Sequence, residues 1–312
     1  MPDLIDGLYL NTYVAPQLLK EFKNYNDRFM AALEPADAGA ISADGIHFNK
    51  LINNVGFLVN NTNPFTPAAM NGKTGFVPWD KLDTTPTSCT DKEARALAFD
   101  KNAAIRVKQS LAFKIGVRDY VANKLAPSKH VSGAMPVLRT TGAVVNGRKM
   151  LTFTDLLNFY AEIEKLNLID ADPKEEVNSW NMILNTEHRS DLLLDMANTN
   201  NHRGNIEFDS NTGELKRFYK FRMWENNDTP LYSATGDLKA RGSVQEAGDQ
   251  KASVFFYSPN TVYHLEKLTI LYKPMEQDTR NADPTSEIRL HGYGLCDKKQ
   301  NYGFGAIVSD NA

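Results

Sequence analysis

Residues 60–93 read NNTNPFTPAAMNGKTGFVPWDKLDTTPTSCTDKE, and this stretch decides how the rest of the chain is interpreted. Pro64 and Pro67 lack a backbone N–H, so they exclude a helix or a central strand, and the Asn residues around them favour turns. A short extended piece follows at 75–79, before the Thr-rich segment 83–90. So long a stretch with so little core material is unusual inside a compact domain unless it has a function. It therefore predicts a two-stranded excursion that extends away from the body of the protein.

The segment after this excursion predicts the longest helix in the middle of the chain, over 103–126. Its apolar residues recur at helical spacing and leave charged residues for the other side. The helix is expected to end at Ala126, because Pro127 disfavours the α conformation of the residue before it. The residues expected to form the apolar stripe are Ile105, Val107, Leu111, Ala112, Ile115, Val121, Ala122 and Leu125.

The remaining elements follow from periodicity. Apolar residues at helical spacing predict helices at 16–33, 153–167 and 186–196, and Thr152 with Asp155 three residues later is typical of a helix start. Alternating apolar residues predict strands near 46–59 and over most of the chain from residue 205 onward. One further helix is expected there, and its members are Pro259, Val262, Tyr263, Leu265 and Leu268.

The composition is that of an ordinary globular protein, with 42% hydrophobic and 23% charged residues among 312. This excludes a wholly disordered or coiled-coil chain and leaves room for one or two domains. Lys and Arg total 35 against 38 Asp and Glu, so the net charge of −3 argues against sequence-wide binding to nucleic acid. The only cysteines, Cys89 and Cys296, exclude a disulfide framework and indicate a reducing compartment. Neither a secretory signal nor a membrane span is expected.

Motifs that carry catalysis or bind cofactors are missing from the sequence. The triplet Gly72-Lys73-Thr74 lacks the upstream glycine of a phosphate loop, and no Gly-x-Ser-x-Gly elbow occurs. The sequence therefore predicts no catalytic residue, no cofactor and no metal, which favours a structural or binding role.

One cluster leaves a metal-dependent enzyme open as an alternative. Its members share a face of the helix predicted at 186–196, and they are Glu187, His188, Asp191 and Asp195. Such side chains bind metals or exchange protons. The favoured interpretation is a solvated face opposite Leu192, Leu193 and Met196, because charged helix faces are usually exposed.

The order of the predicted elements is the most informative feature of the sequence. A helical N-terminal arm, a long Pro/Asn/Thr-rich excursion, one long helix, a mixed middle region and late glycine-containing strands follow one another. This order resembles that of the major capsid proteins of tailed bacteriophages, especially of phages of gut bacteria. The stretches that carry the resemblance are FVPWDKLDTTPT at 76–87, AFDK at 98–101, NSWNMIL at 178–184, GELKRFYKF at 213–221 and IRLHGYG at 288–294. Lys220 departs from the pattern, since a glycine is common there.

The resemblance implies an α+β fold, the tailed-phage major capsid fold, with an N-terminal arm, an extended loop, a peripheral domain with a long spine helix, and an axial domain. The divisions expected on this basis are 1–59 for the arm and first strand, 60–100 for the extended loop, 101–130 for the peripheral domain with the spine helix, 131–264 for the axial domain, and 265–312 for return strands that complete the peripheral domain.

The resemblance also implies a role. It implies a non-enzymatic subunit that self-assembles, as hexamers and pentamers, into an icosahedral shell around the viral genome. Expected partners are other copies of the chain and scaffold, portal and decoration proteins, with DNA enclosed but not bound by sequence and no membrane involved. The expected location is the virion, after assembly in the host cytoplasm. The apolar residues expected at contacts between subunits are Leu18, Phe22, Phe29, Phe65, Phe76, Val77 and Trp79.

Two alternatives to a shell subunit remain open from the sequence. One is the metal-dependent enzyme that uses the charged face of 186–196. The other is a different virion component, such as a tail or minor capsid protein, because it would share the strand-rich second half.

Overall fold

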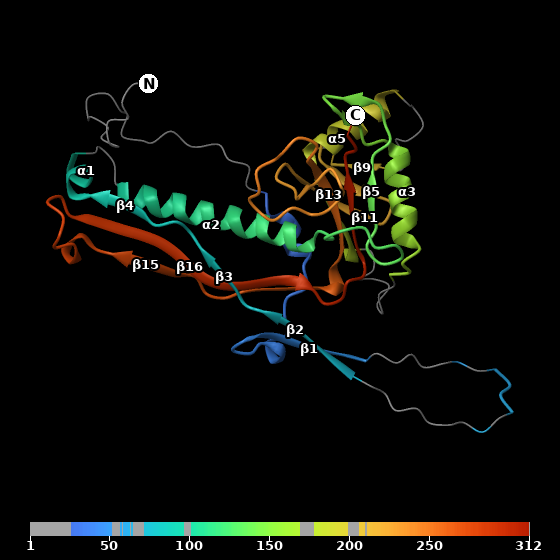
Figure 1. Cartoon of the computed structure of the whole chain (residues 1–312), viewed down its shortest axis with the longest axis horizontal. Coiled ribbons are helices and arrows are strands. Elements are labelled where there is room, and N and C mark those ends of the chain that lie inside the picture. Colours follow the sequence, from blue (N-terminus) through green and yellow to red (C-terminus); the bar gives the residue numbers. More distant parts are fainter. Residues whose placement is uncertain are drawn as a thin grey trace.

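The computed structural model shows a rounded body, a long arm and a projecting hairpin (Figure 1). The arm carries α2 (Lys101–Leu125) above β16 (Thr285–Lys298), and the hairpin leaves the molecule near the junction of arm and body. The residues that the structure describes are 26–51, 57, 59–62, 64, 72–96, 101–168, 178–198, 206–209 and 211–311.

The arm contains a sheet of five described strands, here called the peripheral sheet, in which four strands pair with one long strand, β16. On one edge β16 pairs with β4 (Thr87–Thr90) and β3 (Asp80–Asp83). On the other edge it pairs with β15 (Thr269–Lys273) and β14 (Thr261–Leu265), and all four pairings are antiparallel. With 14 residues at about 3.4 Å each, β16 is about 48 Å long. This single strand therefore sets the length of the arm.

Helix α2 packs on the peripheral sheet through one narrow seam. Its seam residues recur every fourth position and are Ile105, Gln109, Phe113, Val117, Val121 and Leu125. The predicted stripe is only partly correct, because Val107 is 69% exposed and Ala112 is also exposed. Residues spaced by four lie one above the other on a helix. Arg118 and Ala122 beside this row are also buried, whereas apolar residues farther round the helix, such as Val107, stay exposed.

The far end of α2 is fixed by the last residue of β16. Lys298 Nζ donates hydrogen bonds to the carbonyl oxygens of Lys124 (2.5 Å) and Ala126 (2.9 Å). The last carbonyls of a helix have no partner within the helix, and a positive charge there complements the helix dipole. This contact holds the helix end against the strand end, where the arm meets the body.

The body contains a second sheet, here called the body sheet, with eight of the described strands. Their order is β5-β17-β13-β8-β11-β10-β9, with β12 paired to β13; β11–β8 and β17–β5 are parallel, and the other pairs are antiparallel. The strands are β5 (Val137–Arg139), β8 (Trp180–Asn185), β9 (Ile206–Phe208), β10 (Leu215–Phe218), β11 (Phe221–Asn226), β12 (Leu231–Tyr232), β13 (Gln250–Tyr257) and β17 (Phe304–Val308).

Both faces of the body sheet are covered. Helices α3 (Phe153–Glu164) and α5 (Thr186–Asn198) lie on one face, over a core that includes Phe255. The other face presents residues such as Phe256 to the C-terminal end of α2. Since adjacent strand residues point to opposite faces, β13 contributes to both cores and reads as a nearly continuous apolar run.

Several sequence predictions of helices are confirmed. Helix α3 begins at Thr152 with a complete capping box, in which the Thr152 hydroxyl accepts from the backbone N–H of Asp155 and the Asp155 carboxylate accepts from that of Thr152. Helices α2 and α5 lie where periodicity placed them. The shorter elements are η1 (Arg28–Ala32), η2 (Ala38–Ala40), α1 (Asp91–Ala96), β6 (Val144–Val145), β7 (Arg148–Lys149), η4 (Ser258–Asn260) and η5 (Met275–Gln277).

Two predicted helices are corrected. The helix expected from Pro259 to Leu268 is wrong, because after η4 the chain forms β14, paired with β16. The β-branched and aromatic run Thr261-Val262-Tyr263 suits that pleated position. Of the helix predicted over 16–33, residues 16–25 lie outside the described residues, and the described part holds only the short 3₁₀ helix η1.

The expected divisions of the chain also need correction. β3 and β4 lie in the peripheral sheet, although both fall within the expected loop 60–100. The last strand, β17, pairs with β13 in the body sheet and does not complete the peripheral sheet. Chain order alone could not place these strands, because each pairs with a segment far away in the sequence.

Candidate functional site

The projecting hairpin is the first candidate surface for function. β1 (Gly45–Leu51) and β2 (Gly72–Pro78) pair antiparallel from Gly45 opposite Pro78 to Leu51 opposite Gly72. This confirms a two-stranded excursion but corrects its bounds, because β1 lies before the predicted range 60–93 and residues 80–90 belong to the peripheral sheet. Within β2, only Val77 is buried. A two-stranded ribbon is marginally stable alone in water, so an exposed one gains most from a partner that covers it.

The base of this hairpin is firmly anchored. Ile46 and Val77 pack in a small core with Val262 of β14 and Leu295 of β16. Beside it, the indole Nε1 of Trp79 donates a hydrogen bond to the Ser42 carbonyl oxygen (3.1 Å). The hairpin is therefore attached to the peripheral sheet at one end, and most of β2 beyond this anchor is exposed.

The residues expected at subunit contacts fall into three groups. Phe76 is 47% exposed and stacks on the His47 ring, with 4.7 Å between ring centroids, and Trp79 is half-buried. Phe29 and Val77 are buried within this chain, which corrects the expectation that they reach a neighbour. Leu18, Phe22 and Phe65 lie outside the described residues.

The edge strand β15 is a second candidate surface, which the sequence did not single out. Ile270, Leu271 and Tyr272 are 60%, 37% and 45% exposed. The sequence predicted a strand at these residues, and an apolar run of this kind is typical of a buried strand. Only the pairing shows that β15 lies at an edge, so no local signal could have revealed its exposure.

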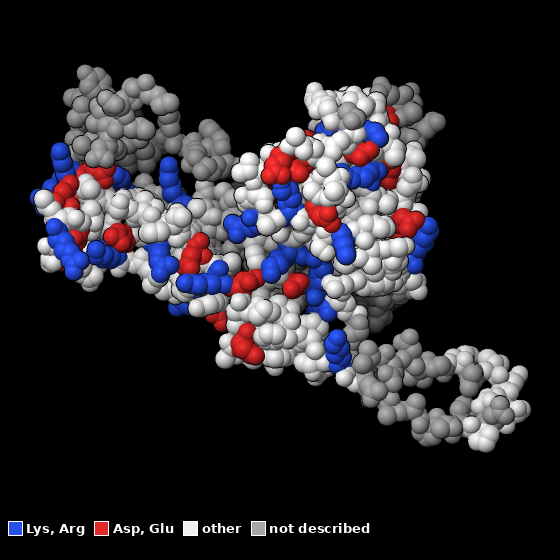
Figure 2. Space-filling model, in the orientation of Figure 1, with Lys and Arg blue, Asp and Glu red and all other residues white. Residues whose placement is uncertain are grey.

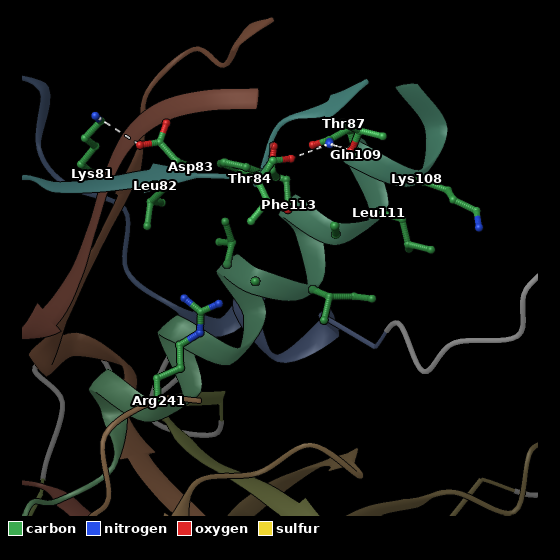
Figure 3. Close-up of a pocket in the computed structure, with 15 residues that line it drawn as sticks. Lys81, Leu82, Asp83, Thr84, Thr87, Lys108, Gln109, Leu111, Phe113 and Arg241 are labelled. Atoms are coloured by element: carbon green, nitrogen blue, oxygen red, sulfur yellow. Dashed lines mark hydrogen bonds and ion pairs between the residues drawn. The ribbon is translucent and has the colours of Figure 1, made fainter. Parts of the chain in front are cut away.

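A groove of about 460 Å³ lies between α2 and the strands β3 and β4 (Figure 3). Gln109 Nε2 ties helix to strand by donating to the Thr85 carbonyl oxygen (2.8 Å) and the Thr87 hydroxyl (2.6 Å). The groove is lined by apolar and charged side chains that include Leu82, Leu111, Ile115, Lys81, Lys108 and Arg241. This mixture is typical of a surface that contacts protein.

Asp83, on strand β3 beside this groove, interacts with three basic side chains. Its Oδ1 accepts from His291 Nδ1 (2.7 Å) and Arg289 Nη1 (3.0 Å), and Lys81 Nζ lies 3.3 Å from Oδ2. The hydrogen bond from His291 and the charge of Lys81 lower the pKa of Asp83. These contacts link β3 to β16, and they leave Asp83 ionised at neutral pH.

The charged face of α5 is buried at its centre, although Glu187 at its start is exposed, and this corrects the favoured sequence interpretation of a solvated face. His188 and Asp191 are buried, whereas Leu193 is 38% exposed. The Asp191 carboxylate accepts two hydrogen bonds from Arg148 of β7 (2.6 and 3.0 Å) and one from the Leu151 backbone N–H (3.1 Å). The helix therefore buries its polar face against β7 and the chain that follows it.

The same contacts leave this face unsuited to a metal ion. Both ring nitrogens of His188 are engaged, by the hydroxyls of Ser253 (2.7 Å) and Ser309 (2.9 Å). Asp195 accepts from the Phe153 backbone N–H (2.8 Å), and Glu187 pairs with Arg148 at 3.3 Å. Among the residues that the structure describes, no group of three or more His, Cys, Asp or Glu is arranged to hold a metal ion.

In the same residues, no helix combines the length and the apolar character that a membrane crossing requires.

The stability of the folded protein is expected to fall in mild acid because of His188. Burial lowers the pKa of His188 to about 4, whereas an unfolded histidine has a pKa of about 6.5. The unfolded state therefore binds the proton first, so this contribution to stability is complete above about pH 6.5 and is lost as the pH falls toward 4, by about 3 kcal/mol. Urea unfolding at pH 7 and pH 4.5 should show His188→Gln losing less stability on acidification than the wild type by about 2–3 kcal/mol. An identical acid loss in both proteins would contradict this role.

Charge is distributed evenly over the visible surface. Figure 2 shows Lys and Arg interspersed with Asp and Glu on the face displayed, without a continuous basic band. Extended contact with nucleic acid needs a basic patch or stripe, so this face does not have the features of a nucleic-acid reader.

Solved structures similar to this chain are phage capsids. The capsid of the cyanophage P-SCSP1u aligns with a TM-score of 0.67 at 14% identity, over 96% of this chain and 92% of that one. The cyanophage Pam1 capsid aligns with a TM-score of 0.67 at 10% identity over 95% of both chains. The capsid of Ralstonia phage GP4 gives 0.65 at 9% identity, over 96% and 94%. Models of protein families and curated protein sequences give no match.

The fold is thereby defined. The hairpin, the arm with its long helix, and the body together form the α+β fold of tailed-phage major capsid proteins, as the resemblance implied. Because these identities are below 15%, the sequence could indicate this class only through the order of its elements.

Proposed function

We propose that this protein is a structural subunit that self-assembles into the icosahedral shell of a tailed phage. The observation that carries the proposal is the alignment of almost the whole chain with almost the whole of several phage capsid proteins. The alignments cover almost all of this chain and almost all of each capsid chain. This favours a shell subunit over a tail or minor capsid component, which would share only part of the architecture. The hairpin supports the proposal further, because it is anchored at its base and exposed beyond it.

The partners follow from this role. Copies of the chain would meet in hexamers and pentamers, and scaffold, portal and decoration proteins would act on the growing shell. A net charge of −3 suits a wall that encloses DNA without binding it by sequence. The two cysteines form no disulfide and are buried, in keeping with assembly in the host cytoplasm before the subunit resides in the virion.

A non-enzymatic role is part of the proposal. It is supported by the engagement of His188 and Asp191 in hydrogen bonds inside the body, where they connect α5 to β13 and β7. Side chains committed in this way stabilise the fold and have no free position for a substrate.

Phe76 provides a test of the hairpin as an assembly contact. Phe76→Asp is expected to raise the concentration needed for assembly at least about ten-fold, because a buried aromatic anchor contributes about 2 kcal/mol to a contact. The thermal midpoint should change little, since Phe76 is 47% exposed in the subunit. Sedimentation velocity over a concentration series measures the effect, with Phe76→Leu as the control that keeps an apolar side chain. Equal assembly of all three proteins would remove Phe76 from the contact.

A further inference from the structure

The two edges of the peripheral sheet are built differently. On one edge, β3 and β4 are four residues each and are separated by 84–86, which includes Pro86. β3 also carries Asp80, Lys81 and Asp83. Short strands, charges and proline are the features that prevent an edge from pairing with another chain. This edge is therefore protected.

The opposite edge lacks this protection. β15 is an unbroken strand of five residues, Thr269-Ile270-Leu271-Tyr272-Lys273, with a single charge at its end and no proline. Its only strand partner among the described residues is β16, and Figure 1 shows it along the margin of the arm. An exposed apolar edge strand is a ready template for another strand.

Large apolar side chains are exposed on both faces of this edge. Ile270 and Tyr272 lie opposite Leu290 and Ile288 on β16 and so share the face that α2 covers. Leu271 lies opposite Arg289 and points to the other face. A single helix or loop could cover only one of these faces, whereas a strand added at the edge covers part of both.

We propose that β15 pairs antiparallel with β15 of a second copy, around a two-fold axis at Leu271, so that two peripheral sheets join into one. This inference rests on the proposed function and names one contact within it. The strand supplies both backbone hydrogen-bonding groups and side chains to the contact.

The sequence of β15 fits this self-pairing. Centring the pair on Leu271 uses all five residues and sets Ile270 opposite Tyr272 and Thr269 opposite Lys273. The two lysines then lie at opposite ends of the paired segment, so no like charges face each other. Aromatic and β-branched residues opposite each other are among the pairs that stabilise antiparallel strands. Shifting the centre by one residue in either direction leaves only three residues paired.

Cysteine crosslinking of assembled protein tests the proposed register. In Leu271→Cys the two new thiols would lie directly opposite each other, with Cα atoms about 5 Å apart, within reach of a disulfide. In Thr269→Cys they would lie about 14 Å apart along the strand, out of reach. The natural Cys89 and Cys296 are buried, at 1% and 0% exposure, and provide a low background.

Mild oxidation of assembled particles, followed by non-reducing electrophoresis, gives the readout. Leu271→Cys should yield at least about ten-fold more covalent dimer than Thr269→Cys, because only the first pair meets disulfide geometry. Mixed assemblies of Thr269→Cys with Lys273→Cys should also crosslink, which fixes the antiparallel register.

The outcomes separate this inference from the proposed function. Particles that form but give no dimer with Leu271→Cys, or equal dimer at both positions, would overturn the β15 contact and leave the shell subunit intact. Crosslinking of β15 to a different protein would also overturn it. Failure of the wild-type chain to assemble at all would overturn the proposed function and, with it, this contact.

Discussion

Shortening the projecting hairpin is expected to produce a folded subunit that no longer assembles. Asn49 and Thr74 are opposite each other in the ribbon, so residues 50–73 can be replaced by Asn-Gly, which closes a two-residue turn between antiparallel strands. The anchor formed by Ile46 and Val77 is retained. The thermal midpoint should therefore move by only a few degrees, whereas the concentration needed for assembly should rise at least about a hundred-fold, as expected when about 3 kcal/mol of contact energy is lost.

The control for this variant keeps the length and changes the sequence. A Gly-Ser linker in place of residues 50–73 should also fail to assemble, because the ribbon is expected to act through its side chains and strand pairing. Circular dichroism checks folding, and sedimentation velocity measures assembly. Shells of normal size from the shortened protein would show that the hairpin is not an assembly element.

The second large effect is expected inside the body, from loss of Arg148. Its guanidinium makes a two-bond contact with Asp191, whose side chain is only 4% exposed. Arg148→Met keeps much of the side-chain volume but leaves a buried carboxylate without its cation. Breaking a buried ion pair on one side costs about 3–5 kcal/mol. Urea unfolding at pH 7 should show a loss of that size.

Glu187→Gln is the matched control for Arg148→Met. Glu187 is also paired with Arg148, at 3.3 Å, but its side chain is 52% exposed. An exposed ion pair contributes about 0–1 kcal/mol, so this variant should be close to wild type. Equal losses in the two variants would contradict the distinction between the buried and the exposed partner.

Local features of the sequence predicted those elements whose signals are themselves local. The capping box of Thr152 and Asp155 defines the start of α3. Pro127 predicted the end of α2, which stops at Leu125, one residue before the predicted end at Ala126. The prolines and Asn residues at the start of 60–93 indicated an excursion, because proline lacks a backbone N–H and asparagine favours turns, although residues 80–90 return to the peripheral sheet as β3 and β4. The order of these elements was sufficient to suggest the fold.

Pairings between distant segments could not be predicted in this way. His188 lies on a helix whose charged residues looked solvated, yet its partners Ser253 and Ser309 are 65 and 121 positions away. The run from Thr261 matched a helical pattern but pairs with β16. For short apolar runs, burial depends on which segment packs against them, and tertiary pairing overrides local preference.

Electron microscopy of the purified protein tests the central claim most directly. The proposal predicts closed or partial shells, or ring-shaped capsomers from which they are built, with the chain as the repeating unit. Image reconstruction should place the projecting hairpin against a neighbouring copy. A uniform monomer at every concentration, with no rings or shells, would contradict the account.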